Sequence, residues 1–152
     1  IGINDMTAAE TAQEELLQIP DAKGVLIQKM VSGVEVILGA VREEGFGHLV
    51  MFGLGGIYTE VLKDVRFSLA PLTHAEALVM IRGIRSYPIL EGVRGESGVS
   101  IEILADYLVR LSLLVNDFPE IEEIDLNPVK GENNDLFVVD ARLLKSVVDE
   151  SA

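Results

Sequence analysis

The sequence predicts an α+β domain in which helices pack on a largely antiparallel sheet. Strand-length apolar runs follow one another in pairs, and helix-periodic segments separate the pairs without the regular alternation of a doubly wound parallel sheet. The chain has 152 residues, 49% of them hydrophobic, and only 5 prolines. That composition is enough to bury one substantial core, so we expect residues 1–152 to form a single domain.

Three segments carry the signals of helices. Thr7 with Glu10, and Thr73 with Glu76, each have the spacing of a capping box, in which two side chains bond the free amides of a first helical turn. In the third segment apolar residues recur three or four positions apart, which places one apolar stripe toward a core. The predicted helices span 8–19, 74–85 and 101–118, and a short closing helix is expected after residue 141.

Apolar runs bounded by glycine, proline, serine or asparagine predict the strands. The first two are expected to form an antiparallel pair, because Ser32 and Gly33 make a short turn between them. A loop is expected over 86–98. The predicted strands span 25–31, 34–41, 49–52, 58–62, 121–129 and 136–141.

The charge excludes broad binding to polyanions. A formal charge of −13 opposes association with nucleic acid or anionic lipid, which rely on basic patches. Residues 63–95 are locally basic, however, and either hold a small anion or carry ordinary solvated charges. There is no cysteine and no apolar run long enough to cross a bilayer, which favours a cytoplasmic protein. The chain opens with Ile1, which suggests a fragment of a larger protein.

Polar residues on the last two predicted strands form a possible metal site. If residues 133–134 make a tight turn, Asn127 lies opposite Asp140, and Asp125 lies opposite Arg142 in a cross-strand ion pair. Opposed amide and carboxylate oxygens suit Mg²⁺. The alternative is that Asn127 ends a strand and Asp140 caps a helix, and the spacing alone does not separate the two.

Several motifs together resemble one family. They are IDLNP at 124–128, VVDAR at 138–142, VMFGLGGIY at 50–58, EVLKDV at 60–65 and APL at 70–72. These segments resemble the C-terminal part of ATP-grasp domains, in particular the nucleotide-binding subunit of succinyl-CoA synthetase and, more specifically, ADP-forming acetyl-CoA synthetase. The resemblance covers essentially the whole chain.

The resemblance implies a set of site residues. The two metal ligands fall on Asn127 and Asp140, and Glu35 falls where an acid commonly binds the ribose hydroxyls. The adenine-recognising hinge strand falls on Gln28, Lys29, Met30 and Val31. Contacts to phosphate or acyl phosphate are expected from Gly53, Gly55, Gly56, Lys63, Arg66 and Arg94, although the glycines also suit simple turns.

The resemblance also implies a function. The chain would be the Mg²⁺- and ATP/ADP-binding part of an ADP-forming acyl-CoA synthetase that couples acyl-CoA and ATP interconversion by phosphoryl transfer. Its partners would be the N-terminal half of the ATP-grasp domain and a CoA-binding domain or subunit that carries a phosphohistidine. No catalytic residue is assigned, and His48 and His74 are expected to be ordinary surface residues. The alternative is a non-catalytic, ligand-sensing region fused to an acetyltransferase.

Overall fold

The computed structural model describes residues 2–56, 64–93, 95 and 97–146. The chain forms two compact units, Ile1–Met30 and Val31–Ala152. The first unit contains helix α1 (Met6–Leu17). Its N-cap is Asp5, whose carboxylate accepts a hydrogen bond from the Ala8 amide at 2.8 Å. The helix therefore begins earlier than the Thr7 capping box predicts, because Asp is an equally good N-cap residue.

The predicted strand over 25–31 is not formed. Residues 25–31 have no regular secondary structure, and Leu26, Ile27 and Met30 are exposed. A strand is held by hydrogen bonds to a neighbouring strand, and the strand pairings of the described residues do not include this run. The antiparallel pair expected around Ser32 and Gly33 is consequently wrong.

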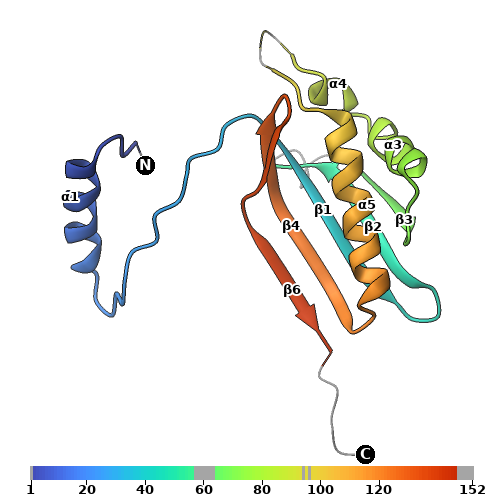
Figure 1. Cartoon of the computed structure of the whole chain (residues 1–152), viewed down its shortest axis with the longest axis horizontal. Coiled ribbons are helices and arrows are strands. Elements are labelled where there is room, and N and C mark those ends of the chain that lie inside the picture. The colour runs from blue at the N-terminus through green and yellow to red at the C-terminus, as the bar shows by residue number, and fades with distance from the viewer. Residues whose placement is uncertain (1, 57–63, 94, 96, 147–152) are drawn as a thin grey trace, which may run out of the picture. The chain divides into compact units, whose positions relative to one another are not determined.

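The second unit is built on one antiparallel, six-stranded sheet (Figure 1). The strand order is β3-β2-β1-β4-β5, and β6 also pairs with β4. This confirms the predicted α+β class. The predicted strand over 58–62 lies outside the described residues. The strands are β1 (Val34–Glu43), β2 (Gly47–Leu54), β3 (Val65–Leu69), β4 (Ile121–Glu132), β5 (Asp135–Val138) and β6 (Ala141–Lys145).

Two strands differ from the prediction for physical reasons. β3 has no counterpart in the prediction, although its apolar residues alternate with polar ones; it is an edge strand of the sheet, and Phe67 and Leu69 are exposed on it. The segment after residue 141 is β6 and not a helix, because it continues the hairpin and pairs along the first half of β4. Tertiary pairing decides a short segment of this kind more strongly than its intrinsic propensity does.

Helices α3 (His74–Arg82) and α5 (Ile101–Asp117) pack against each other and against the sheet (Figure 1). The predicted capping box of α3 is present: Thr73 Oγ1 accepts from the Glu76 amide at 3.3 Å, and the Glu76 carboxylate accepts from the Thr73 amide at 2.8 Å. A short helix, α4 (Tyr87–Leu90), lies inside the predicted loop. Within the described residues, no helix combines the length and apolarity needed to cross a bilayer.

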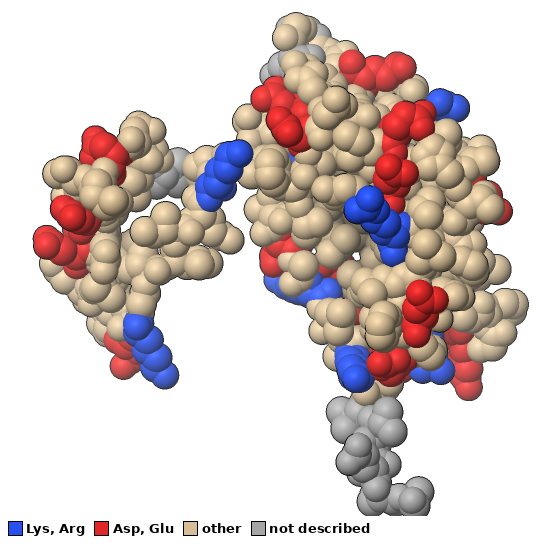
Figure 2. All heavy atoms as spheres, viewed as in Figure 1, with Lys and Arg blue, Asp and Glu red and all other residues tan. Residues whose placement is uncertain are grey.

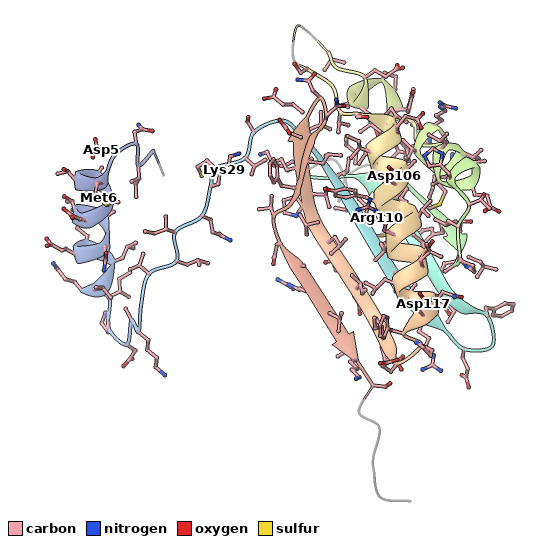
Figure 3. The ribbon with its side chains drawn as sticks, viewed as in Figure 1. Asp5, Met6, Lys29, Asp106, Arg110 and Asp117 are labelled. Carbon is pink, nitrogen blue, oxygen red and sulfur yellow. The ribbon has the colours of Figure 1, made fainter. Side chains whose placement is uncertain are left out.

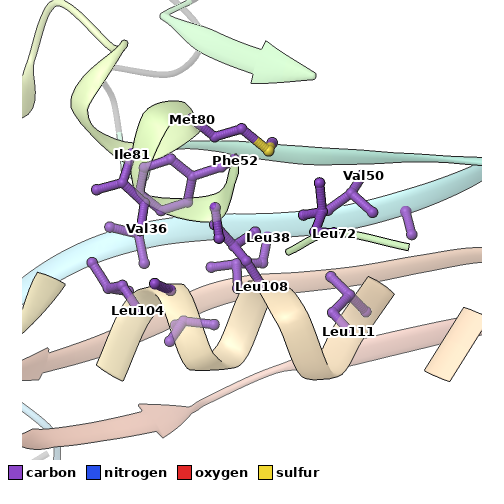
Figure 4. Packing of buried hydrophobic residues seen from close by; sticks show 14 of the residues in the cluster. Val36, Leu38, Val50, Phe52, Leu72, Met80, Ile81, Leu104, Leu108 and Leu111 are labelled. Atoms are coloured by element: carbon purple, nitrogen blue, oxygen red, sulfur yellow. The ribbon is translucent and has the colours of Figure 1, made fainter. Parts of the chain in front are cut away.

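The core lies between the sheet and helices α3 and α5 (Figure 4). The predicted stripe of α5 is buried at Leu104, Leu108, Leu111 and Val115, which confirms the helical periodicity. The opposite side of α5 is exposed and carries Asp106, Arg110 and Asp117 (Figure 3). Strands β1 and β2 contribute Val36, Leu38, Val50 and Phe52 to the same core.

Candidate nucleotide and metal site

The last hairpin has the register that the sequence predicts. Residues Glu132 and Asp135 pair at its end, so that Asn133 and Asn134 form the turn, and Asn133 has a φ of 53°. Asp125 pairs with Arg142, and the Asn127 amide donates to the Asp140 carbonyl at 3.1 Å. The structure therefore places Asn127 opposite Asp140.

The hairpin is irregular at this pair. On the β1 side, Val36 pairs with Val129 and Leu38 pairs with Leu126, so Asn127 and Pro128 together face one residue of β1. Such a bulge reverses the alternation of side chains. Ile124 and Val129 are accordingly both buried, although they are an odd number of residues apart. Regular alternation on β4 is therefore confined to the stretch from Glu123 to Leu126, since the pairing with β6 also shifts between Ile121 and Glu123.

The second strand of the hairpin is interrupted at the same level. β5 ends at Val138 and β6 begins at Ala141, which leaves Val139 and Asp140 between them. Asn127 and Asp140 are both exposed, and neither side chain bonds to another described residue. The bulge and the interruption thus leave two oxygen-bearing side chains unpaired at facing positions.

The predicted ion pair between Asp125 and Arg142 is not formed. The two residues face each other in register, but the ion pairs within the described part of the chain do not include them. Arg142 is exposed, and ordering a long exposed side chain for one ion pair gains little free energy. The register prediction was right, and the contact built on it was wrong.

A cavity of about 810 Å³ opens at the end of the sheet where β1 begins and β2 and β4 end. It brings together three of the predicted site residues, Glu35, Gly55 and Gly56. Its other walls come from the start of β1 and the residues before it, the ends of β2 and β4, and α4 with the residues after it. They are Ser32, Gly33, Val34, Leu54, Ile89, Val93, Gly95, Ser97 and Glu132.

Lys130 does not line the cavity, but it contacts Glu35, and no pattern in the sequence indicates this contact. Its Nζ lies 2.7 Å from Glu35 Oε1, and the two residues face each other across β1 and β4. They are 95 positions apart in the chain. Only knowledge that β1 pairs with β4 could have found this contact, and the sequence contains no local signal for that pairing.

The glycine segment at the end of β2 is tied to the same glutamate. The Gly55 amide donates to the Glu35 carbonyl at 2.7 Å, and a Cβ on Gly56 would lie 3.1 Å from Glu35 Oε2. Gly53 does not line the cavity. A Cβ there would lie 2.7 Å from Val65 Cγ1, so a side chain at Gly53 would collide with β3.

Of the other residues predicted to contact phosphate, the structure describes Arg66, which does not line this cavity. Arg66 lies on β3, where its Nε donates to the Gly83 carbonyl at the end of α3 at 2.8 Å. Lys63 and Arg94 lie outside the described residues. Gln28, Lys29 and Met30 belong to the first unit, and Val31 begins the second. Their predicted contacts with adenine or phosphate stay predictions.

Asp64 anchors the chain where it enters β3. Its carboxylate accepts hydrogen bonds from the Arg85 amide at 2.9 Å and from the Ser86 amide and hydroxyl at 2.7 and 2.6 Å. Burial raises the pKa of this carboxyl, but the hydrogen bonds from Ser86 and Arg85 lower it by more, so the pKa lies below its ordinary value. Asp64 is therefore an ionised structural residue.

The two histidines differ from each other. His48 is buried, and its Nε2 lies 2.6 Å from the Ile121 carbonyl, so the expectation of a surface residue was wrong for His48. Burial follows from its inward position on β2, a central strand of the sheet. His74 is half-exposed beside Glu102 and Asp106 and is a surface residue as expected.

The charged side chains on the visible surface of the described residues do not gather into a basic or an acidic patch. On the face seen in Figure 2, basic side chains are scattered among acidic ones over the described residues.

Comparison with known proteins gives a match to a family model described as an ATP-grasp domain, over residues 2–144. The chain belongs to the ATP-grasp family. The match confirms the resemblance to ATP-grasp domains that the sequence motifs indicate.

Its relatives are acyl-CoA ligases. Over 128 residues it is 52% identical to the acetate–CoA ligase (ADP-forming) I subunit beta of Pyrococcus furiosus, covering 82% of this chain and 55% of that one. It is 47% identical over 152 residues to acetate–CoA ligase (ADP-forming) I of Archaeoglobus fulgidus, covering 95% of this chain and 22% of the relative. This ATP-grasp chain therefore spans about half of one relative and about a fifth of the other.

A solved structure supports the same assignment. The dinucleotide-forming acetyl-coenzyme A synthetase 1 of Ca. Korarchaeum cryptofilum matches with a TM-score of 0.72 and 42% identity, covering 77% of this chain and 55% of that one. That structure is a complex with coenzyme A and Mg-AMPPCP, and its phosphohistidine segment points toward the nucleotide-binding site.

Proposed function

We propose that this chain forms part of the nucleotide-binding cleft of an ADP-forming acyl-CoA ligase. The parent protein would interconvert acyl-CoA and ATP through phosphoryl transfer. The relatives described above are ligases, which favours this function over a ligand-sensing region fused to an acetyltransferase. Because the chain spans only part of those relatives, we also propose that it is one portion of a larger enzyme.

The pair Asn127 and Asp140 carries this proposal. An amide oxygen and a carboxylate oxygen are hard donors of the kind that Mg²⁺ prefers. No group of three or more His, Cys, Asp or Glu that could hold a metal occurs among the described residues. Two protein donors suit Mg²⁺, which usually keeps several waters and binds substrate phosphates instead of filling an all-protein cage.

The spacing along β4 supports the same arrangement. Asn127 and Lys130 are three residues apart, and Lys130 binds Glu35. Three strand residues span about 10 Å, which is comparable to the reach from a ribose to the terminal phosphates of a nucleotide. Glu35 would accept hydrogen bonds from the ribose hydroxyls while Asn127 and Asp140 hold the metal that neutralises the phosphates.

The chain's residues would act by positioning. In phosphoryl transfer, catalysis comes almost entirely from orientation and from neutralisation of charge, and a bound Mg²⁺ supplies the latter. Asn127 and Asp140 would fix the metal, Glu35 the ribose, and the backbone of Gly55 and Gly56 would leave room for the phosphates. The partners would be the rest of the ATP-grasp domain and a CoA-binding domain or subunit with a phosphohistidine.

Nucleotide titration of the intact parent protein tests the proposal. Asn127→Ala and Asp140→Ala should each weaken binding of ADP in the presence of Mg²⁺ by about tenfold or more, the value of a lost ligand to a charged group. Binding without Mg²⁺ should change little. Asp135→Ala, an exposed acid on the same hairpin, is the matched control. Unchanged Mg²⁺-dependent affinity in both site variants would refute the proposal.

A further inference from the structure

The ion pair between Lys130 and Glu35 gives Lys130 a specific role. We propose that Lys130 is a positioning residue that holds the Glu35 carboxylate in the orientation that recognises the ribose hydroxyls of the nucleotide. This inference rests on the proposed function and extends it to a residue on another strand. Lys130 itself would not touch the ribose.

The geometry of the pair favours a fixed orientation. Glu35 and Lys130 are direct cross-strand partners on β1 and β4, and the Lys130 Nζ lies 2.7 Å from the Glu35 Oε1. The Lys130 side chain is 25% exposed, against 46% and 58% for the basic partners of the other two lysine or arginine ion pairs found in the described residues. The Glu35 side chain is 35% exposed, much like the acidic partners of those two pairs at 35% and 33%, so the difference lies in the lysine. A charge that is more enclosed is screened less by solvent.

The second carboxylate oxygen is confined from the other side. Glu35 Oε2 lies 3.1 Å from the position that a Gly56 Cβ would occupy, and the Glu35 backbone is bonded to the Gly55 amide. The carboxylate therefore lies between the Lys130 ammonium and the glycine segment. Lys130 belongs to β4 and the glycine segment directly follows β2, and both strands lie next to β1, so Glu35 is confined from both sides of its own strand.

This orientation matters for ribose recognition. A carboxylate can accept a hydrogen bond on each oxygen from two neighbouring hydroxyls, but only when it is ionised and its plane is aligned with them. A free glutamate side chain loses rotamer entropy when it binds. The contact with Lys130 restricts the rotamers of Glu35 before the nucleotide arrives. Removal of Lys130 should therefore weaken recognition of the hydroxyls specifically.

The test compares two nucleotides that differ only in those hydroxyls. In the intact parent protein, dissociation constants are measured with Mg²⁺ for ADP and for 2′,3′-dideoxy-ADP. Lys130→Met should weaken ADP binding about tenfold, the value of a charge-assisted hydrogen bond, and dideoxy-ADP binding less than about twofold. Lys130→Arg keeps the charge and should restore most of the preference, and it tests the idea even if the Met variant folds poorly. Lys145→Met removes a lysine from the Glu120 ion pair at the far end of β4 and should change neither constant.

A double variant locates the effect. Once Glu35→Gln has removed the carboxylate, Lys130→Met should cause little further loss of ADP affinity, because the two residues act as a unit. Equal losses for ADP and dideoxy-ADP in Lys130→Met would overturn the inference, since they indicate a phosphate contact or a general structural role. If Lys130→Met leaves both constants unchanged while Asn127→Ala weakens binding, this inference fails and the proposed function stands. If the wild-type protein binds neither nucleotide, both fail.

Discussion

The backbone amide of Asn127 donates to the carbonyl of Asp140 at 3.1 Å, at the level where β4 bulges and the strand opposite is interrupted. One hydrogen bond thus joins the two residues whose side chains the ATP-grasp resemblance assigns to a metal. In a regular antiparallel strand pair, the side chains at these two positions would pack against their neighbours. The bulge in β4 and the interruption between β5 and β6 leave both side chains exposed.

The glycine segment gives a prediction about binding. Gly56→Ala should weaken Mg-ADP binding about tenfold, because the new Cβ would displace the Glu35 carboxylate, from which it would be 3.1 Å away. Gly45→Ala is the matched control, since Gly45 also has a positive φ, 83° against 70°, but no atom lies within 4 Å of its added Cβ. Both variants should lose similar stability in urea unfolding, and only Gly56→Ala should lose affinity in calorimetric titration. A similar affinity in both variants would contradict the assignment of Gly56.

The Asp64 anchor predicts a pH dependence of stability. At pH 7, Asp64→Asn should lower the free energy of unfolding by about 1 kcal/mol. This is less than the loss of a fully buried, hydrogen-bonded carboxylate would cost, because Asp64 is partly exposed and solvent screens its charge. The pKa of Asp64 is lowered in the folded state by hydrogen bonds from Ser86 and Arg85, although burial raises it. Its stabilisation is therefore present above the ordinary value of 3.8 and is lost as the pH falls through the lower folded value.

Urea unfolding at pH 7 and pH 3 measures this effect. The difference between wild type and Asp64→Asn should be smaller at pH 3 than at pH 7. Asp135→Asn changes an exposed carboxylate and should show little difference at either pH. A difference for Asp64→Asn that grows on acidification would mean that the carboxylate is not held in its ionised form.

The two histidines predict contrasting effects on stability. His48→Ala should lower the free energy of unfolding by about 2 kcal/mol, because it leaves a cavity and removes the hydrogen-bond partner of the Ile121 carbonyl. His74→Ala removes a half-exposed side chain and should change stability by less than about 0.5 kcal/mol. Thermal or urea unfolding of the two variants side by side checks the order, and equal effects would contradict the buried position of His48.

Elements with strong local signals could be predicted from the sequence. The apolar stripe of α5, the capping box of α3 and the turn at Asn133 each depend on residues close together in the chain. The hairpin register follows from the turn alone, and for this reason it placed Asn127 opposite Asp140 correctly.

Features that depend on distant pairing could not be predicted in this way. The run at 25–31 has the composition of a strand but no strand partner among the described residues, and β6 is a strand because β4 lies beside it. The bulge at Asn127 and the contact of Lys130 with Glu35 both require the pairing of β1 with β4. Local patterns set which segments are extended or helical, whereas long-range pairing decides how such segments combine into a site.

The most direct test of the account is the position of the metal in a nucleotide complex. In a crystal structure of the intact parent protein with a non-hydrolysable ATP analogue and Mn²⁺ in place of Mg²⁺, anomalous scattering would locate the ion. We predict one ion bridging the nucleotide phosphates and both the Asn127 amide oxygen and the Asp140 carboxylate, at roughly 2.0–2.3 Å from each. An ion bound to the phosphates with neither side chain within coordination distance would contradict it.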